Sequence, residues 1–186
     1  VLIVNLVPLV ARSSAYGTAA PPPAPPGLAT SETSLVEAEA LAEARAKEWA
    51  ADAALVRADG SWNAPREASG IEAPTIAWTF SYYSATKGQL ASVGVDDSDL
   101  LWVPPREIPI VPTSLAAFPP VFGSDVAWVS FLGAGGDVHL ESRPNTVVHF
   151  SLQPKDGMPV WVVSARSDTT TTSITMDADT GTVRFE

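Results

Sequence analysis

The acidic stretch Asp177 to Gly181, with the sequence DADTG, is the part of this chain that comes nearest to a metal-binding loop. A calcium loop of the EF-hand type has oxygen ligands at positions 1, 3 and 5, glycine at position 6 and glutamate at position 12. Here glycine falls at position 5. We therefore predict a hairpin turn in which Asp177 and Asp179 bond to backbone amides and Gly181 adopts a positive φ. The same interpretation, with adventitious calcium as the alternative, applies to the acidic run Asp96, Asp97 and Asp99.

The two histidines, His139 and His149, are the other candidates for metal ligands. If the segment HLE is extended, His139 and Glu141 share one face, and His149 lies on the polar side of its predicted strand. A zinc site needs three or four ligands with supporting hydrogen bonds. We predict two surface imidazoles and no metal site.

Catalytic motifs are absent from this sequence. There is no Gly-x-Ser-x-Gly elbow, and the lack of cysteine excludes disulfides, thiolate ligands and thiol nucleophiles. The stretch GAGGD, residues 133–137, resembles a phosphate-binding loop, but it follows a predicted helix, whereas a dinucleotide turn follows a strand and opens a helix. We interpret it as a helix stop. We predict no catalytic residues, no cofactor and no enzymatic activity.

The charge balance limits the possible partners. The formal net charge is −10, and only three lysines occur, at positions 47, 87 and 155. Nucleic-acid binding depends on Lys and Arg neutralising phosphates, and no basic patch is present. We therefore exclude nucleic acid, and anionic lipid surfaces are disfavoured for the same reason.

Helical spacing dominates residues 34–60. Ser34 as N-cap and Glu37 three residues later form a capping box, and Gly60 is the predicted stop. The residues that recur at spacings of three and four are Ala38, Leu41, Ala42, Arg45, Trp49, Ala53 and Val56.

Alternating strands follow. Residues 75–83 place Ile76, Trp78, Phe80 and Tyr82 on one face. Further strands are predicted at 89–95 and 100–103, and Pro104 and Pro105 should end the last one, because proline cannot donate to a ladder. A second helix from Ser124 to the glycines at 135–136 precedes strands within 146–153, 158–166, 173–177 and 182–185.

Two stretches share one pattern, WTFSYYSATKGQLASVGVDDSDLLWV from Trp78 and WVVSARSDTTTTSITMDADTGTVRF from Trp161. Each opens with a tryptophan in an alternating strand and continues with a polar turn, a second strand, an acidic turn and a final strand. Because a helix precedes each stretch, we infer two copies of one helix-plus-meander unit.

The second copy resembles a PepSY domain. The elements that carry the resemblance are Gly157, Pro159 and Trp161, then DADTG and a short terminal strand. The resemblance is best over residues 124–186 and weaker over 34–103, where VDDSD lacks the Thr-Gly pair. It implies an extracytoplasmic, non-catalytic α+β module, and some relatives are linked to protease inhibition.

We therefore predict an α+β fold of two PepSY-like helix-plus-antiparallel-meander units in tandem. The first unit would span 34–103 and the second 124–186, joined by a proline-rich connector at 104–123. Ahead of them lie an apolar segment at 1–11 and a Pro/Ala-rich linker at 12–33, which we interpret as a stiff spacer.

The apolar segment, VLIVNLVPLVA, is about half the length of the roughly 20 apolar residues that a membrane-spanning helix needs. Three interpretations remain open: the outer half of a signal anchor, a signal-peptide remnant, and an extended arm that adds a strand to a neighbouring molecule. The side chains that would contact membrane or partner are Val1, Leu2, Ile3, Val4, Leu6, Val7, Leu9 and Val10.

Function follows from this organisation. We predict an extracytoplasmic interaction module, periplasmic or at the cell surface, tethered to the membrane by its N-terminus and acting as an accessory or structural subunit among other proteins of an envelope assembly. The alternatives are a secreted protease inhibitor or regulator, and a filament subunit that uses residues 1–11 for strand addition. Trp62, in a predicted polar loop, is either an exposed contact anchor or folded back on the helix end.

Overall fold

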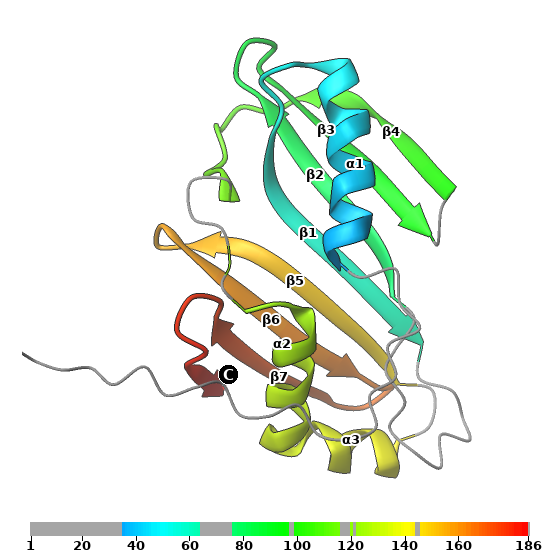
Figure 1. Cartoon of the computed structure of the whole chain (residues 1–186). Coiled ribbons are helices and arrows are strands. Elements are labelled where there is room, and N and C mark those ends of the chain that lie inside the picture. The colour runs from blue at the N-terminus through cyan, green and yellow to red at the C-terminus, as the bar shows by residue number, and fades with distance from the viewer. Residues whose placement is uncertain are drawn as a thin grey trace, which may run out of the picture.

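A computed structural model describes residues 35–63, 76–96, 99–115, 120, 122–143 and 146–185 of the chain. Eight strands form one antiparallel sheet in the order β4-β3-β2-β1-β5-β6-β7-β8 (Figure 1). The strands are β1 (Ala54–Asn63), β2 (Ala77–Ser84), β3 (Gln89–Asp96), β4 (Asp99–Glu107), β5 (Val147–Lys155), β6 (Met158–Arg166), β7 (Thr171–Asp177) and β8 (Val183–Phe185). The helices are α1 (Leu35–Trp49), α2 (Ser124–Phe131) and α3 (Asp137–Ser142), with a π-helical turn η2 (Leu132–Gly136) between the last two.

The predicted fold class of two tandem helix-plus-meander units is wrong, because the strands form a single continuous sheet. The difference arises at β1, which we predicted as the end of a helix followed by a loop. β1 pairs with β2 on one side and with β5 on the other, so it joins the strands from both halves of the chain. In the β1–β5 seam, Ala58 lies opposite Leu152 and Gly60 lies opposite Phe150.

Helix α1 ends at Trp49, and the side chain of Lys47 reaches the turn that follows it. The Lys47 Nζ atom donates to the carbonyl oxygens of Ala51 at 3.3 Å and Ala53 at 2.7 Å, a favourable place for a cation. The chain then turns into β1. The buried face of the helix is narrower than predicted and consists of three alanines, Ala38, Ala42 and Ala46.

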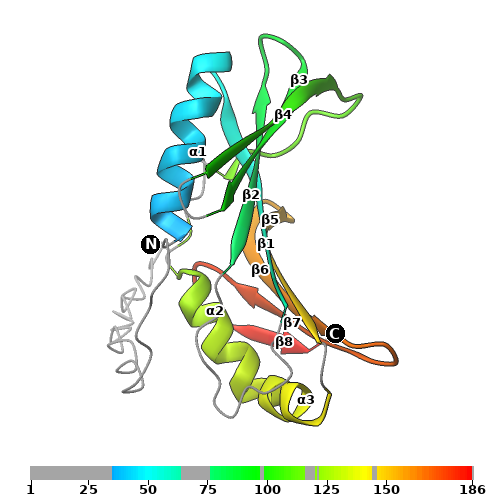
Figure 2. The same cartoon turned by 90° about the vertical axis from the view of Figure 1, so that its right-hand side faces the viewer.

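The hydrophobic core lies between the helices and one face of the sheet, and Figure 2 shows α1 and α2 on that same face. The predicted alternation in β2 is confirmed, since Trp78, Phe80 and Tyr82 are buried. Trp161 is fully buried, and its Nε1 atom donates to the carbonyl oxygen of Phe122 at 2.9 Å. Aromatic side chains therefore supply much of the burial that holds the helices on the sheet.

The predicted helix stop at residues 133–136 is found at Gly135, which leaves helical backbone angles with φ at 95°. The helices α2 and α3 are therefore joined across a kink in η2. At Gly136 an added Cβ would clash with the ring of Phe131. Gly135 therefore kinks the chain between α2 and α3, and the missing side chain at Gly136 leaves room for the ring of Phe131.

Strand β4 continues through Pro104 and Pro105 to Glu107, beyond its predicted end. It lies at the edge of the sheet, where only one side of the strand needs backbone donors. The ladder to β3 is irregular at this point, with a register shift between Leu90 and Ser92.

Candidate functional site

The sheet face turned away from the helices, called here the open face, carries mostly small and polar side chains. Trp102 packs against Trp49 of α1, with ring centroids 5.9 Å apart. Its neighbours Leu101 and Val103 therefore point to the open face, because strand side chains alternate. The row that crosses all eight strands on this face, from β4 to β8, is Leu101, Gly94, Thr79, Asp59, Ser151, Val162, Thr175 and Arg184.

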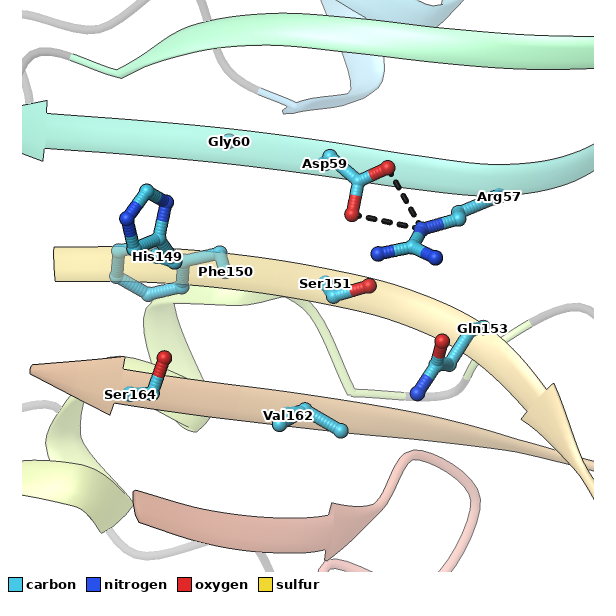
Figure 3. Close-up of a pocket in the computed structure, with 9 residues that line it drawn as sticks. All are labelled: Arg57, Asp59, Gly60, His149, Phe150, Ser151, Gln153, Val162 and Ser164. Atoms are coloured by element: carbon cyan, nitrogen blue, oxygen red, sulfur yellow. Dashed lines mark hydrogen bonds and ion pairs between the residues drawn. The ribbon is translucent and has the colours of Figure 1, made fainter. Parts of the chain in front are cut away.

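A small pocket of about 280 Å³, called here the seam pocket, lies in the middle of the open face, where β1, β5 and β6 meet (Figure 3). Gly60 and Phe150 contribute to its floor from the strands themselves. The side chains that reach it from the open face are Arg57, Asp59, His149, Ser151, Gln153, Val162 and Ser164.

An ion pair sets the electrostatics of the seam pocket. The Nε atom of Arg57 lies 2.8 Å from Asp59 Oδ1 and 2.7 Å from Asp59 Oδ2. The two residues are two apart on β1 and so share a face, which brings the side chains together. Both are partly exposed, so the pair contributes little to stability, but it fixes the direction in which the guanidinium points.

Ser151 faces Asp59 across the seam. Its Oγ atom is buried and has no hydrogen-bond partner among the described residues. An unpaired buried hydroxyl is uncommon in folded proteins, because a buried polar atom without a partner has lost its hydrogen bonds to water.

Serine, histidine and aspartate meet in the seam pocket, but they are not arranged as a catalytic triad. Within the described chain, no hydrogen bond joins Ser151 Oγ to His149, and the carboxylate of Asp59 is occupied by Arg57. A nucleophile needs a base within hydrogen-bond reach. The arrangement offers hydrogen-bond donors for binding.

The predicted turn at DADTG is confirmed. The Oδ1 atom of Asp177 accepts hydrogen bonds at 2.9 Å from the backbone amides of Asp179 and Thr180, and Gly181 has φ at 71°. The Thr180 amide, followed by that of Asp179, lowers the pKa of the Asp177 carboxyl. Asp177 accepts these bonds, while Asp179 contributes its own backbone amide and not a carboxylate ligand.

The other acidic run flanks the β3–β4 turn, with Asp96 directly opposite Asp99. Asp97 lies outside the described residues. Over the described part of the chain, no group of three or more His, Asp or Glu residues comes together in a way that could hold a metal ion.

The two histidines occupy different environments. His149 is exposed on the open face, as predicted, and lines the seam pocket. His139 is buried, which overturns its predicted surface position, because HLE forms part of α3 and is not extended. The Nδ1 atom of His139 lies 2.7 Å from Thr172 Oγ1, so His139 and Glu141 do not form a shared extended face.

Trp62 lies on β1 and not in a polar loop. It is half-buried, and its ring packs edge-on against Trp128 of α2, so neither predicted position is observed. Its role as a partner contact stays a prediction. The remaining predicted contact residues, in the segment 1–11, lie outside the described residues.

Sequence reasoning missed the seam pocket because it missed β1. A signal was present: polar residues Arg57, Asp59 and Ser61 alternate with Ala58 and Gly60. Alternation of this kind is typical of a half-buried strand, but alanine and glycine mark the buried face only weakly.

Comparisons with known proteins give a likeness in fold. No family model matches this chain, so the PepSY resemblance stays a prediction, and no curated protein matches it. The chain is similar to a crystal structure from Clostridium difficile 630 described as a "putative lipoprotein", with a TM-score of 0.50 and 14% identity over 81% of this chain and 90% of that one. Among the described residues, no helix combines the length and the apolar character needed to cross a membrane.

Proposed function

We propose that this protein is a non-catalytic interaction module outside the cytoplasm, an accessory subunit that binds another protein of the cell envelope through the open face of its sheet. The proposal rests on one observation, that among the described residues this face is uncovered and exposes large apolar side chains. In the described chain the helices cover only the other side, while Leu101 and Val103 are 69% and 44% exposed on the open face.

The distribution of side chains supports protein binding over binding of a small molecule. Exposed large apolar side chains lie at one edge of the open face, and hydroxyl-bearing and charged residues occupy its middle. Protein interfaces combine apolar contacts with polar groups in this way. The seam pocket alone, at about 280 Å³, is small and carries few apolar side chains, unlike the larger apolar cavities that hold small ligands.

The location outside the cytoplasm is supported by two features. The apolar segment 1–11 and the stiff spacer 12–33 form an arrangement suited to a membrane tether. The clostridial structure with a similar fold is described as a lipoprotein candidate, a class of protein anchored at a membrane surface.

A matched pair of variants tests the docking face. Leu101→Lys places a charge on the open face, and Val36→Lys places the same charge on α1, where Val36 is 73% exposed. The full-length protein would be purified from its own cells in mild detergent, and the co-purifying proteins identified by mass spectrometry. We expect a partner that is lost with Leu101→Lys and retained with Val36→Lys.

Two results would contradict the proposal. One is equal recovery of the same partners with both variants, which would place binding elsewhere. The other is a freely soluble monomer without any partner in membrane fractions. Circular dichroism of both variants, showing an unchanged fold, makes the comparison valid.

A further inference from the structure

We infer that the seam pocket binds a carboxylate, presented by an Asp or Glu side chain of the partner, and that Arg57 is its main contact. This inference rests on the proposed docking role of the open face. It adds a chemical class of ligand and a specific residue, argued from three observations.

The first observation is the way Arg57 is held. Asp59 engages only the Nε atom, and the two terminal nitrogens have no hydrogen-bond partner in the described part of the chain. Figure 3 shows the guanidinium of Arg57 between Asp59 on β1 and the neighbouring strand β5. A guanidinium with its outer edge free is suited to bidentate binding of a carboxylate.

The second observation is the unpaired hydroxyl of Ser151. Ser151 lines the seam pocket, and its Oγ atom is buried without a partner among the described residues. A carboxylate bound to Arg57 can accept a hydrogen bond from this hydroxyl, which would supply the missing partner. Gln153, which lines the same pocket as Arg57, adds an amide that can donate to the same ligand.

The third observation is position. Arg57 lies on β1, one of the two middle strands of the eight-stranded sheet. Residues that dominate binding energy are enriched in arginine and cluster near the centre of an interface. A partner that covers the open face would therefore enclose Arg57 and remove it from water, which strengthens its interaction with a carboxylate.

The same contacts indicate that the ligand carries a negative charge. A cationic ligand would need a free carboxylate, but both oxygens of Asp59 already lie within 2.8 Å of Arg57 Nε. The groups still available in the seam pocket are the outer guanidinium edge, the Ser151 hydroxyl and the Gln153 amide. Donors of this kind favour an anionic acceptor.

The test uses two blocked tripeptides, acetyl-Gly-Glu-Gly-amide and acetyl-Gly-Gln-Gly-amide, which differ only in the carboxylate. Each would be titrated into the full chain at constant ionic strength while ¹H–¹⁵N spectra are recorded. We expect saturable shifts of the Ser151 and Gln153 amides and of the Arg57 Nε–H with the Glu peptide, and a Glu preference of about tenfold or more.

Variants distinguish a specific contact with Arg57 from a general effect of positive charge on the protein. Arg57→Gln should remove the Glu preference, and Arg57→Lys, which keeps the charge but not the fork, should reduce it. Arg166→Gln removes an exposed arginine at the far end of β6 and should leave the preference intact. Equal shifts from the Glu and Gln peptides, or equal loss with Arg57→Gln and Arg166→Gln, would overturn the inference.

This inference and the proposed function can fail separately. If Leu101→Lys abolishes partner binding while Arg57→Gln has no effect on it or on the peptides, the docking face stands and the carboxylate contact is wrong. If the peptides bind as expected but Leu101→Lys leaves partner binding unchanged, the seam pocket stands and the docking role is wrong.

Discussion

The indole rings of Trp62 and Trp128 meet edge-on, with centroids 5.7 Å apart and ring planes at 85°. Trp62 is on β1 and Trp128 is on α2, so this contact connects a strand from the first half of the chain to a helix from the second half. Together with the β1–β5 ladder, it makes the two halves of the sheet one packing unit.

Trp62→Ala should therefore destabilise the whole protein. We expect a loss of about 2 kcal/mol in the free energy of unfolding, because a half-buried aromatic side chain and its edge-on contact are removed. Urea unfolding followed by circular dichroism measures it. Leu101→Ala, at an exposed position, is the control and should change stability by about 0.5 kcal/mol or less. Equal stability of the Trp62 variant and the wild type would show that the contact does not stabilise the fold.

Gly60 is predicted to tolerate no side chain. A Cβ atom there would lie 2.5 Å from Ile76 Cγ2 and 2.9 Å from the ring of Trp78, so Gly60→Ala should cost about 1–3 kcal/mol through overpacking. Gly133 has nothing within 4 Å of the same added atom and lies in the helical turn between α2 and α3. Gly133→Ala should be neutral or stabilising by up to about 1 kcal/mol. A melting temperature that is higher for Gly60→Ala than for Gly133→Ala would contradict this packing.

His139 should make stability depend on pH. Burial, and secondly the nearby Arg143, lower the pKa of His139 from its ordinary value of 6.5, and its Nε2 atom is buried without a partner among the described residues. Because the folded state disfavours the protonated ring, the stability from the neutral ring is present above pH 6.5 and is lost as pH falls toward the lowered pKa. The free energy of unfolding at pH 8 and pH 5 measures the effect.

His139→Asn is the variant for this test, since the amide can keep the hydrogen bond to Thr172 and does not titrate. We expect the wild type to lose more stability than the variant between pH 8 and pH 5. Parallel losses in the two proteins would exclude His139 as the cause.

Asp52 connects the turn after α1 to the β2–β3 hairpin. Its carboxylate accepts hydrogen bonds from the Thr86 amide at 2.8 Å and from the Ser84 hydroxyl at 2.7 Å, and these bonds, with Thr86 first, lower its pKa to about 2. The ionised form is therefore favoured by folding, and its stabilisation is present above the ordinary value of 3.8 and lost as pH falls toward 2.

Asp52→Asn should lower the melting temperature at pH 7, and the difference from the wild type should narrow between pH 4 and pH 2. Thermal unfolding at several pH values checks this. A difference that stays constant across that range would mean that the carboxylate charge is not what holds the hairpin.

Local patterns in the sequence were enough to predict several elements. The alternation of Trp78, Phe80 and Tyr82 identifies β2 because a strand with one buried face needs apolar residues at every second position. The DADTG turn follows from the preference of aspartate and glycine for tight turns. The helix beginning near Ser34 was correctly placed, but its end was not, because the alanine-rich pattern continues past Trp49.

The candidate site was beyond such reasoning. His149 was correctly placed on an exposed strand face, but its neighbours in the seam pocket come from β1, which sequence analysis did not identify as a strand. The small residues Ala58 and Gly60 hide the alternation of β1, because their burial leaves little hydrophobic signal.

The amino-acid sequence by itself determined the chemical inventory: no cysteine, a strongly acidic balance, an apolar start, and the alternating runs and turns of most strands. Only the tertiary structure decided that β1 pairs with β5 and so brings Arg57, Ser151 and Gln153 into one pocket. The physical reason is that strands are joined by backbone hydrogen bonds, which are nearly the same for every sequence. The choice of partner strand is therefore made by the packing of side chains that are distant along the chain.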